Sequence, residues 1–260
     1  MWFVPASAMT EEQRSTLPTQ VAIRTPNCLL RVAQALFRSI PTPPDPLEAI
    51  IQTTSSRTNV SLLGDAFKAF GTDKSTTHNY HILYGYVLTQ LHQPVRLLEI
   101  GLGSNDTRIP SNMGPKSTPG ASIRAFRSVF PELILYGADI DPTIKIEGID
   151  IFTIDQTEPE SFDRVIEGAG TGFDLIIDDG LHSPDANLNT LFFALHNLNP
   201  RGYFVIEDIP EAALPIWYSV QLMCLATNRF TATILRARQS YVFVVTGNFT
   251  SIPIKGTRNV

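Results

Sequence analysis

Two apolar segments that each end in acidic residues constrain this chain more than any other feature of its sequence. They are FDLIIDDGLHSP (173–184) and GYFVIEDIP (202–210), and glycine or proline bounds each apolar run. Such runs are typical of strands covered on both faces, as in parallel sheets with helices above and below. Ligands of such sheets bind beyond the carboxyl ends of the strands. The sequence therefore predicts a site where these two strands end.

Acidic residues and one histidine follow both strands directly. Asp178, Asp179 and His182 leave the first strand, and Glu207 and Asp208 leave the second. Neighbouring strands lie about 5 Å apart, so these side chains would share one rim of the sheet. Clustered carboxylates repel one another unless they are protonated or joined by a cation, and hard oxygen ligands favour Mg²⁺. The cluster suits one metal ion or one reacting hydroxyl.

Strand geometry separates adjacent carboxylates. Successive residues of a strand point to opposite faces, so Glu207 and Asp208 can reach one ion only where the backbone has left regular strand geometry. Pro210 indicates such an exit. The same argument divides Asp178 from Asp179. One of them would face the ion, and the other would face a helix or a backbone partner.

Composition describes an ordinary globular chain with a small-molecule partner. The 260 residues are 43% hydrophobic and 17% charged, with a net charge of −5 and no block of like charges. This composition predicts no basic surface that would bind nucleic acid or an anionic membrane. Residues 1–9 do not form a secretion signal, no apolar run is long enough to span a membrane, and two cysteines are too few for a disulfide framework. We therefore expect a cytoplasmic protein.

Strand-like and helical patterns alternate through most of the chain. The strand-like segments are 96–101, 133–141, 150–155, 173–179, 202–208, 231–237 and 241–247. The helical patterns between most of them predict right-handed βαβ units, and hence an α/β fold with a doubly wound, mostly parallel sheet. The last two segments are three residues apart. Because a parallel crossover needs a longer connection, they predict an antiparallel hairpin.

The N-terminal region reads differently from the rest. Residues 1–58 predict a helical, proline-rich extension, with a helix near 28–39 and prolines at 41–46, and residues 59–260 form the main domain. The extension would serve as a lid or as a subunit contact in a homo-oligomer, and the sequence does not separate these roles.

A polar turn, GTDKSTTHN (71–79), follows a predicted short helix that ends at Phe70 and precedes an amphipathic helix that reaches about Leu91. Asp73 and Lys74 suggest an ordinary polar turn. The aromatic and histidine side chains at helical spacing would be core or surface residues, or contacts of a substrate or cofactor. These residues are His78, Tyr80, His81 and Tyr84, and the same alternatives apply to Trp217 and Tyr218.

The first strand of the domain ends in Gly-x-Gly, at Gly101 and Gly103. Glycines there let the backbone approach a bound nucleotide or amino-acid moiety, although many α/β turns carry two glycines for packing alone. Glu99 precedes this turn. Asp139 ends the next strand, where an acidic residue can accept hydrogen bonds from ribose hydroxyls, and Asp141 is a competing candidate.

The third strand ends at Asp155 and Gln156, where a carboxylate or amide could meet an adenine amino group. A dinucleotide site would carry a third glycine where this chain has Asp106, and its helix would follow directly. Here a long loop (104–118) precedes a helix predicted to start at Thr118–Pro119, with Thr118 as its N-cap. S-adenosylmethionine carries no phosphate and has a cationic sulfonium and an amino group, so it suits these acidic surroundings better than a pyrophosphate does.

Six motifs in this order resemble class I S-adenosylmethionine-dependent methyltransferases: GTDKSTTHNYHILY, LLEIGLG, PGASIRAFRSVFP, YGADID, FDLIIDDGLH and GYFVIEDI. In particular they are similar to the metal-dependent macrolide-sugar O-methyltransferases of the mycinamicin type, over about residues 68–210. The resemblance implies a Rossmann-like, seven-stranded sheet. It also implies Asp179, Glu207 and Asp208 as ligands of Mg²⁺ and His182 as general base. The residues we expect to contact the cofactor are Glu99, Gly101, Gly103, Asp139, Asp155, Gln156 and Asp178.

The predicted function is therefore S-adenosylmethionine-dependent and Mg²⁺-dependent O-methylation of a small-molecule hydroxyl, on a sugar or another natural product. Ser183 and Pro184 predict a helix start beside His182, and a helix N-terminus favours the neutral imidazole that can accept a proton. Three alternatives stay open at this point. They are a metal-independent methyltransferase, a nicotinamide-dependent oxidoreductase and a binding protein without catalysis.

Overall fold

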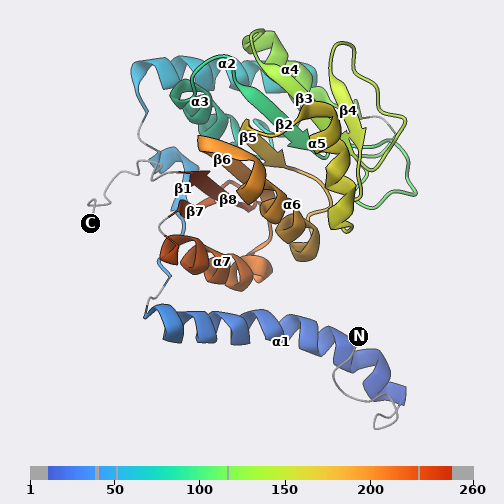
Figure 1. Cartoon of the computed structure of the whole chain (residues 1–260), viewed down its shortest axis with the longest axis vertical. Coiled ribbons are helices and arrows are strands. Elements are labelled where there is room, and N and C mark those ends of the chain that lie inside the picture. Colours follow the sequence, from blue (N-terminus) through green and yellow to red (C-terminus); the bar gives the residue numbers. More distant parts are fainter. Residues whose placement is uncertain (1–10, 39–40, 51, 116, 228, 248–260) are drawn as a thin grey trace.

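The computed structural model describes residues 11–38, 41–50, 52–115, 117–227 and 229–247, and it describes side chains from residue 24 onward. Within these residues the strands form one eight-stranded sheet with the order β1-β7-β8-β6-β5-β2-β3-β4 (Figure 1). The strands are β1 (Asp45–Pro46), β2 (Arg96–Ile100), β3 (Ile134–Asp139), β4 (Asp150–Thr153), β5 (Phe173–Asp178), β6 (Leu198–Ile209), β7 (Phe230–Arg236) and β8 (Tyr241–Gly247).

Strand directions confirm the predicted mostly parallel sheet with a C-terminal antiparallel hairpin. β8 pairs antiparallel with both β6 and β7, and the other neighbouring pairs within the described residues are parallel. The sheet has one strand more than predicted, because Asp45 and Pro46 pair with Leu235 and Arg236. A proline is tolerated there because an edge strand does not need every backbone N–H in the ladder.

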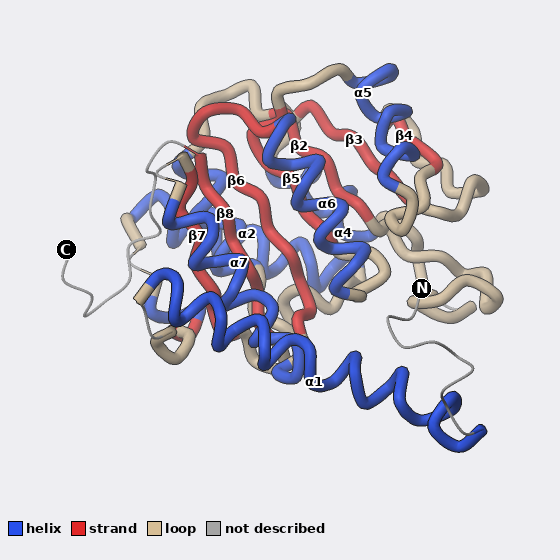
Figure 2. The backbone as a smooth tube through the Cα atoms, turned by 60° about the horizontal axis from the view of Figure 1, so that its bottom comes forward, coloured by secondary structure: helices blue, strands red, loops and turns tan. Residues whose placement is uncertain are grey.

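Helices cover both faces of the sheet (Figure 2). They are α1 (Glu11–Phe37), α2 (Thr54–Phe70), α3 (His81–Gln90), α4 (Ala121–Val129), α5 (Asp163–Ala169), α6 (Pro184–Asn197) and α7 (Leu214–Ala226). Side chains of α2, α3 and α4 join one core, which includes Leu97 of β2, and side chains of α5, α6 and α7 join a second core, which includes Leu98. Alternate strand residues thus feed opposite cores, as the two-residue period of a strand requires.

The N-terminal helix differs from its prediction. The helix expected near residues 28–39 begins at Glu11 instead, and it lies outside α7, away from the sheet (Figure 1). The predicted boundary between residues 58 and 59 falls inside α2, which starts at Thr54. The prediction that residues 1–9 form no secretion signal falls outside the described residues. No helix in the described part of the chain combines the length and apolar character that crossing a membrane requires.

Two helix predictions need correction. The predicted amphipathic helix is α3, but Leu83 to Leu88 are all buried, because α2 covers the side of α3 that faces away from the sheet. The helix expected to start at Thr118–Pro119 is α4, which begins at Ala121 after Gly120 in the left-handed conformation. The backbone N–H of Ala121 bonds to the Thr118 carbonyl, so the threonine does not act as a side-chain cap.

Close packing of α2 on α3 depends on Gly85. A Cβ atom at Gly85 would lie 2.5 Å from the backbone nitrogen of Val60. We expect Gly85→Ala to lower the free energy of unfolding by about 1–3 kcal/mol, because overpacking outweighs the better helix propensity of alanine. Urea unfolding measures this change.

Gly64→Ala, in the same interface, is the matched control. Its Cβ would meet a side-chain atom of His81 at 3.1 Å, which can move, rather than backbone. An equal loss of stability in both variants would contradict the packing argument.

Candidate functional site

A pocket of about 320 Å³ opens at the carboxyl ends of the parallel strands, where the sequence predicted the site. The predicted site residues that line it are Gly101, Gly103, Asp139, Asp155, Gln156, Asp179, His182 and Asp208. Apolar side chains complete the wall, from Ile100, Leu102, Ile109, Met113, Ile140, Ile154 and Leu181. The predicted residues Glu99, Asp178 and Glu207 are not in the lining, because each is fully buried behind it.

The two glycines of the first turn allow close contacts within the protein. Both have positive φ angles, and a Cβ at Gly101 would lie 2.1 Å from the carbonyl oxygen of Asp179. A Cβ at Gly103 would lie 1.9 Å from Met113 Sδ. Gly101 therefore lets the turn after β2 contact the turn after β5. Gly103 lets Met113 of the 104–118 loop pack against the backbone of the first turn.

One side of the pocket is set by hydrogen bonds to Asp139. Its carboxylate accepts the backbone N–H of Leu102 at 2.7 Å and that of Asp141 at 2.9 Å. Asp141, the competing candidate, bonds to Ser104 and Thr143 and does not line the pocket. Of the two aspartates, Asp139 therefore lines the pocket and Asp141 does not.

Asp178 acts on the pocket through Gln156. Gln156 donates to Asp178 at 2.8 Å and accepts the backbone N–H of Leu181 at 2.8 Å. Asn187 of α6 donates to the other oxygen of Asp178 at 3.0 Å. Burial raises the pKa of Asp178, although these donors lower it. Of the adjacent aspartates, Asp178 thus takes helix and side-chain partners, and Asp179 faces the pocket.

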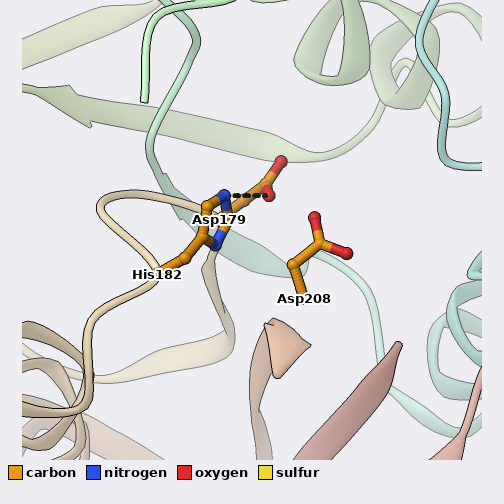
Figure 3. A group of neighbouring side chains, drawn as sticks. All are labelled: Asp179, His182 and Asp208. Atoms are coloured by element: carbon orange, nitrogen blue, oxygen red, sulfur yellow. Dashed lines mark ion pairs between the residues drawn. The ribbon is translucent and has the colours of Figure 1, made fainter. Parts of the chain in front are cut away.

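Asp179, His182 and Asp208 come together on the other side of the pocket (Figure 3). One potential ligand atom from each lies within 4.8 Å of the others. His182 Nε2 is 3.9 Å from Asp179 Oδ1, and His182 Nδ1 is buried and has no hydrogen-bond partner among the described residues. Two carboxylates and an imidazole in this arrangement can hold a cation or receive a proton.

The backbone leaves regular strand geometry at Asp208, as the sequence argument required for this position. Asp208 has a φ of 54°, and the pairing of β6 with β8 shifts register between Ile206 and Ile209. Even so, Glu207 and Asp208 do not face the same space. Asp208 lines the pocket, whereas Glu207 is buried in the interior with 1% exposure.

A buried lysine lies among the acidic side chains. Lys74 Nζ is 2.6 Å from Asp179 Oδ2 and 3.6 Å from Glu99 Oε1, and it also donates to Glu207. The Tyr84 hydroxyl donates to the other oxygen of Glu207. Burial alone would lower the pKa of Lys74, but the three carboxylates raise it well above its usual value. Lys74 therefore stays an ammonium ion and neutralises part of the acidic charge.

This role of Lys74 was not predicted, because the sequence around it suggested an ordinary polar turn. That turn leaves α2 at Gly71 and crosses the rim of the sheet before α3 begins. The sequence did hold one indication of this role. Four carboxylates predicted at one rim of the sheet need a nearby positive charge. Lys74 is the basic residue of the motif that precedes α3.

Glu99 lies deeper than predicted. Ser122 Oγ donates to its carboxylate at 2.6 Å. The second carboxylate oxygen of Glu99 is buried and accepts no hydrogen bond from the part of the chain that the structure describes. Burial raises the pKa of Glu99 to about 7, although Lys74 and Ser122 lower it. Ser122 and Ala121, at the start of α4, stand in the lining next to it.

The 104–118 loop forms a wall of the pocket. Ile109, Pro110 and Met113 line the cavity, and Ser111 Oγ donates to the carbonyl of Leu181 at 3.2 Å. The loop therefore joins the two turns that follow β2 and β5.

The other aromatic candidates divide between site and core. His78 and Tyr80 contact Asp208. Trp217 belongs to the core, where it packs on Phe243 with ring centroids 5.0 Å apart.

No family model matches the chain, but curated proteins and solved structures are similar to it. Mycinamicin VI 2''-O-methyltransferase of Micromonospora griseorubida is 38% identical over 129 residues, which cover 48% of this chain and 29% of that protein. 8-demethyl-8-(2-methoxy-alpha-L-rhamnosyl)-tetracenomycin-C 3'-O-methyltransferase of Streptomyces olivaceus is 33% identical over 144 residues, 53% of this chain and 34% of that protein. The chain thus spans about a third of the length of the curated relatives it matches.

Solved structures show the same fold. The methyltransferase of the mycinamycin biosynthetic pathway in complex with Mg and SAH has a TM-score of 0.59 and 23% identity, over 74% of this chain and 56% of that one. Its complex with Mg, SAH and mycinamycin VI has a TM-score of 0.57 and 22% identity, with the same coverage. The Rossmann-like fold and the resemblance carried by the six motifs are confirmed.

Replacement of Lys74 tests whether its ion pairs stabilise the protein. Lys74→Met leaves Asp179 and Glu207 without their cation, and we expect the free energy of unfolding to fall by about 3–5 kcal/mol. Denaturant titration gives this value. Lys68→Met removes the same charge from an exposed position of α2 and should have little effect. Equal losses from both variants would show that Lys74 is not paired as described.

Proposed function

We propose that this chain is an S-adenosylmethionine-dependent O-methyltransferase that acts on a hydroxyl of a small molecule, a sugar or another natural product, with the help of Mg²⁺. The observation that carries the proposal is the meeting of Asp179, His182 and Asp208 at one side of the strand-end pocket. The similarity to sugar and macrolide O-methyltransferases supports the same reaction class.

The cofactor would occupy the part of the pocket near β2 and β3. Asp139, which lines the pocket, would accept hydrogen bonds from ribose hydroxyls, and Asp155 and Gln156 would contact the adenine amino group. Ile140 and Ile154 offer apolar surface to the adenine ring. The acidic surroundings favour a cofactor with a cationic sulfonium over one with a pyrophosphate. Glu99 remains a predicted contact that would act from behind Ser122.

The residues present fit a hard divalent cation. Asp179 and Asp208 offer carboxylate oxygens to the pocket, and such donors favour Mg²⁺ over a thiophilic metal. Glu207 was also predicted as a ligand, but its carboxylate lies behind the pocket lining, where Lys74 and Tyr84 bond to its two oxygens. When bound, Mg²⁺ lowers the pKa of a hydroxyl that it contacts.

His182 would act as the general base. It directs Nε2 toward Asp179 and directly precedes Ser183, the N-cap of α6. The imidazole takes the proton of the acceptor hydroxyl. The acceptor oxygen then bonds to the methyl carbon of the sulfonium as the carbon–sulfur bond breaks, and S-adenosylhomocysteine leaves with the electron pair.

A metal-independent methyltransferase is the second candidate, because Lys74 already supplies one cation to the acidic cluster. In that case the ammonium ion alone would balance Asp179 and Glu207. Methyl transfer that survives chelation by EDTA would favour this candidate over the Mg²⁺-dependent one.

Binding of the product tests the cofactor assignment without knowledge of the acceptor. Calorimetric titration with S-adenosylhomocysteine should show micromolar affinity, and Asp139→Ala should weaken it because the variant loses a hydrogen-bond acceptor for ribose. Asp150→Ala, at the opposite end of the sheet, is the control. If the wild-type protein binds NAD and not S-adenosylhomocysteine, the methyltransferase proposal is wrong.

Turnover tests the base. We expect His182→Ala to reduce the rate of methyl transfer by about 10²–10⁴-fold, because the acceptor hydroxyl then has no positioned base. Transfer of labelled methyl groups to hydroxylated sugars and glycosides measures the rate. His196→Ala on α6 removes an exposed histidine and should leave the rate unchanged. Near-normal turnover in His182→Ala would remove His182 from the base role.

A further inference from the structure

Asp208 holds an unfavourable backbone conformation at the centre of the acidic cluster. Its φ of 54° lies in the left-handed region, which residues other than glycine rarely adopt. Such conformations cost about 1–3 kcal/mol and persist only where neighbouring groups enforce them. Some contact must therefore hold Asp208 in this state.

The Tyr80 hydroxyl supplies that contact twice. It donates to Asp208 Oδ1 at 2.6 Å, and it accepts the backbone N–H of Asp208 at 3.2 Å. One oxygen atom thus fixes both the side chain and the backbone of the same residue.

Tyr80 is itself held firmly. The residue is 1% exposed, and its hydroxyl lies 2.6 Å from Ser240 Oγ in the turn between β7 and β8. The His78 ring stacks on the Tyr80 ring with centroids 4.7 Å apart, and His78 Nε2 is 3.4 Å from Asp208 Oδ1. Contacts from Tyr80 and His78 converge on Oδ1, so they fix the orientation of the whole carboxylate.

We propose that Tyr80 is a positioning residue that holds the Asp208 carboxylate in the orientation required to bind a divalent cation. The inference rests on the proposed function, because the cation is the one expected beside Asp179 and His182. It assigns a role to one of the aromatic residues before α3, which the proposed reaction does not otherwise use. Groups that orient a metal ligand in this way typically change metal affinity about 10–100-fold when they are removed.

The test is Tyr80→Phe, which keeps the buried ring and removes only the hydroxyl. The probe is Mn²⁺, an oxygen-preferring cation whose free concentration is measured by electron paramagnetic resonance. We expect the Kd for Mn²⁺ to rise about 10–100-fold. The Kd for S-adenosylhomocysteine, measured by calorimetry, should not change, because Tyr80 does not line the pocket. Tyr136→Phe removes a hydroxyl from the middle of β3 and should leave both constants unchanged.

A double-mutant cycle separates positioning from general loosening of the fold. Asp208→Asn should itself weaken Mn²⁺ binding, and Tyr80→Phe should add no further loss in that background, because its effect passes through Asp208. Losses that add independently would overturn the inference. Ser240→Ala is a second variant, for use if Tyr80→Phe does not fold, and it should weaken Mn²⁺ binding in the same direction.

The outcomes distinguish this inference from the proposed function. If Asp208→Asn weakens Mn²⁺ binding and Tyr80→Phe does not, the metal site stands and the role of Tyr80 is overturned. If the wild-type protein does not bind Mn²⁺, or Asp208→Asn binds it as tightly as wild type, the proposed metal site fails and the inference fails with it.

Discussion

The buried ammonium group of Lys74 stabilises the acidic end of this sheet. Lys74 meets Glu99 of β2, Asp179 after β5 and Glu207 of β6, so it joins three parts of the sheet rim. Without a cation, carboxylates this close would repel one another in a setting where water cannot screen them. Asp179 lines the pocket and its Oδ1 lies 3.9 Å from His182 Nε2, and Glu207 falls in the segment where β6 loses its regular pairing with β8. The turn that carries Lys74 is therefore part of the site.

The site divides into two halves with different physical character. In the half near β2 and β3, hydrogen bonds to backbone amides fix the orientation of Asp139 and Gln156. Apolar side chains line the rest of this half. The other half is a small cluster of two carboxylates and an imidazole, and two of its residues, His182 and Asp208, have left-handed backbones. Gly101 brings the halves together, because it lets the β2 turn contact the carbonyl of Asp179. This division matches a reaction in which a bound cofactor is placed against a hydroxyl that must lose its proton.

Sequence reasoning succeeded where the signal was local. Apolar runs such as 173–178 have the length and composition of covered strands, so β2 to β8 and the hairpin were predicted, whereas the two-residue strand β1 was not. It failed where a neighbour decided the outcome. α3 was predicted to be amphipathic, but α2 buries its outer face, and α4 begins at Ala121 because Gly120, not Thr118, ends the long loop. Lys74 was assigned to an ordinary polar turn, because nothing in the sequence of such a turn shows which part of the sheet it crosses.

The sequence by itself determined which chemical groups stand at the ends of the strands. Chain direction and the two-residue period of a strand place Asp179, His182 and Asp208 at one rim, and both can be read from a few adjacent residues. Only the tertiary structure decided which of these groups form an ion pair or a hydrogen bond with a distant residue. Lys74 and Asp179 are 105 positions apart in the chain, and Tyr80 and Asp208 are 128 apart. Local sequence patterns carry no information on such contacts. The contacts form only when the turn before α3 packs over the rim of the sheet, because the charges buried there then need a counter-charge.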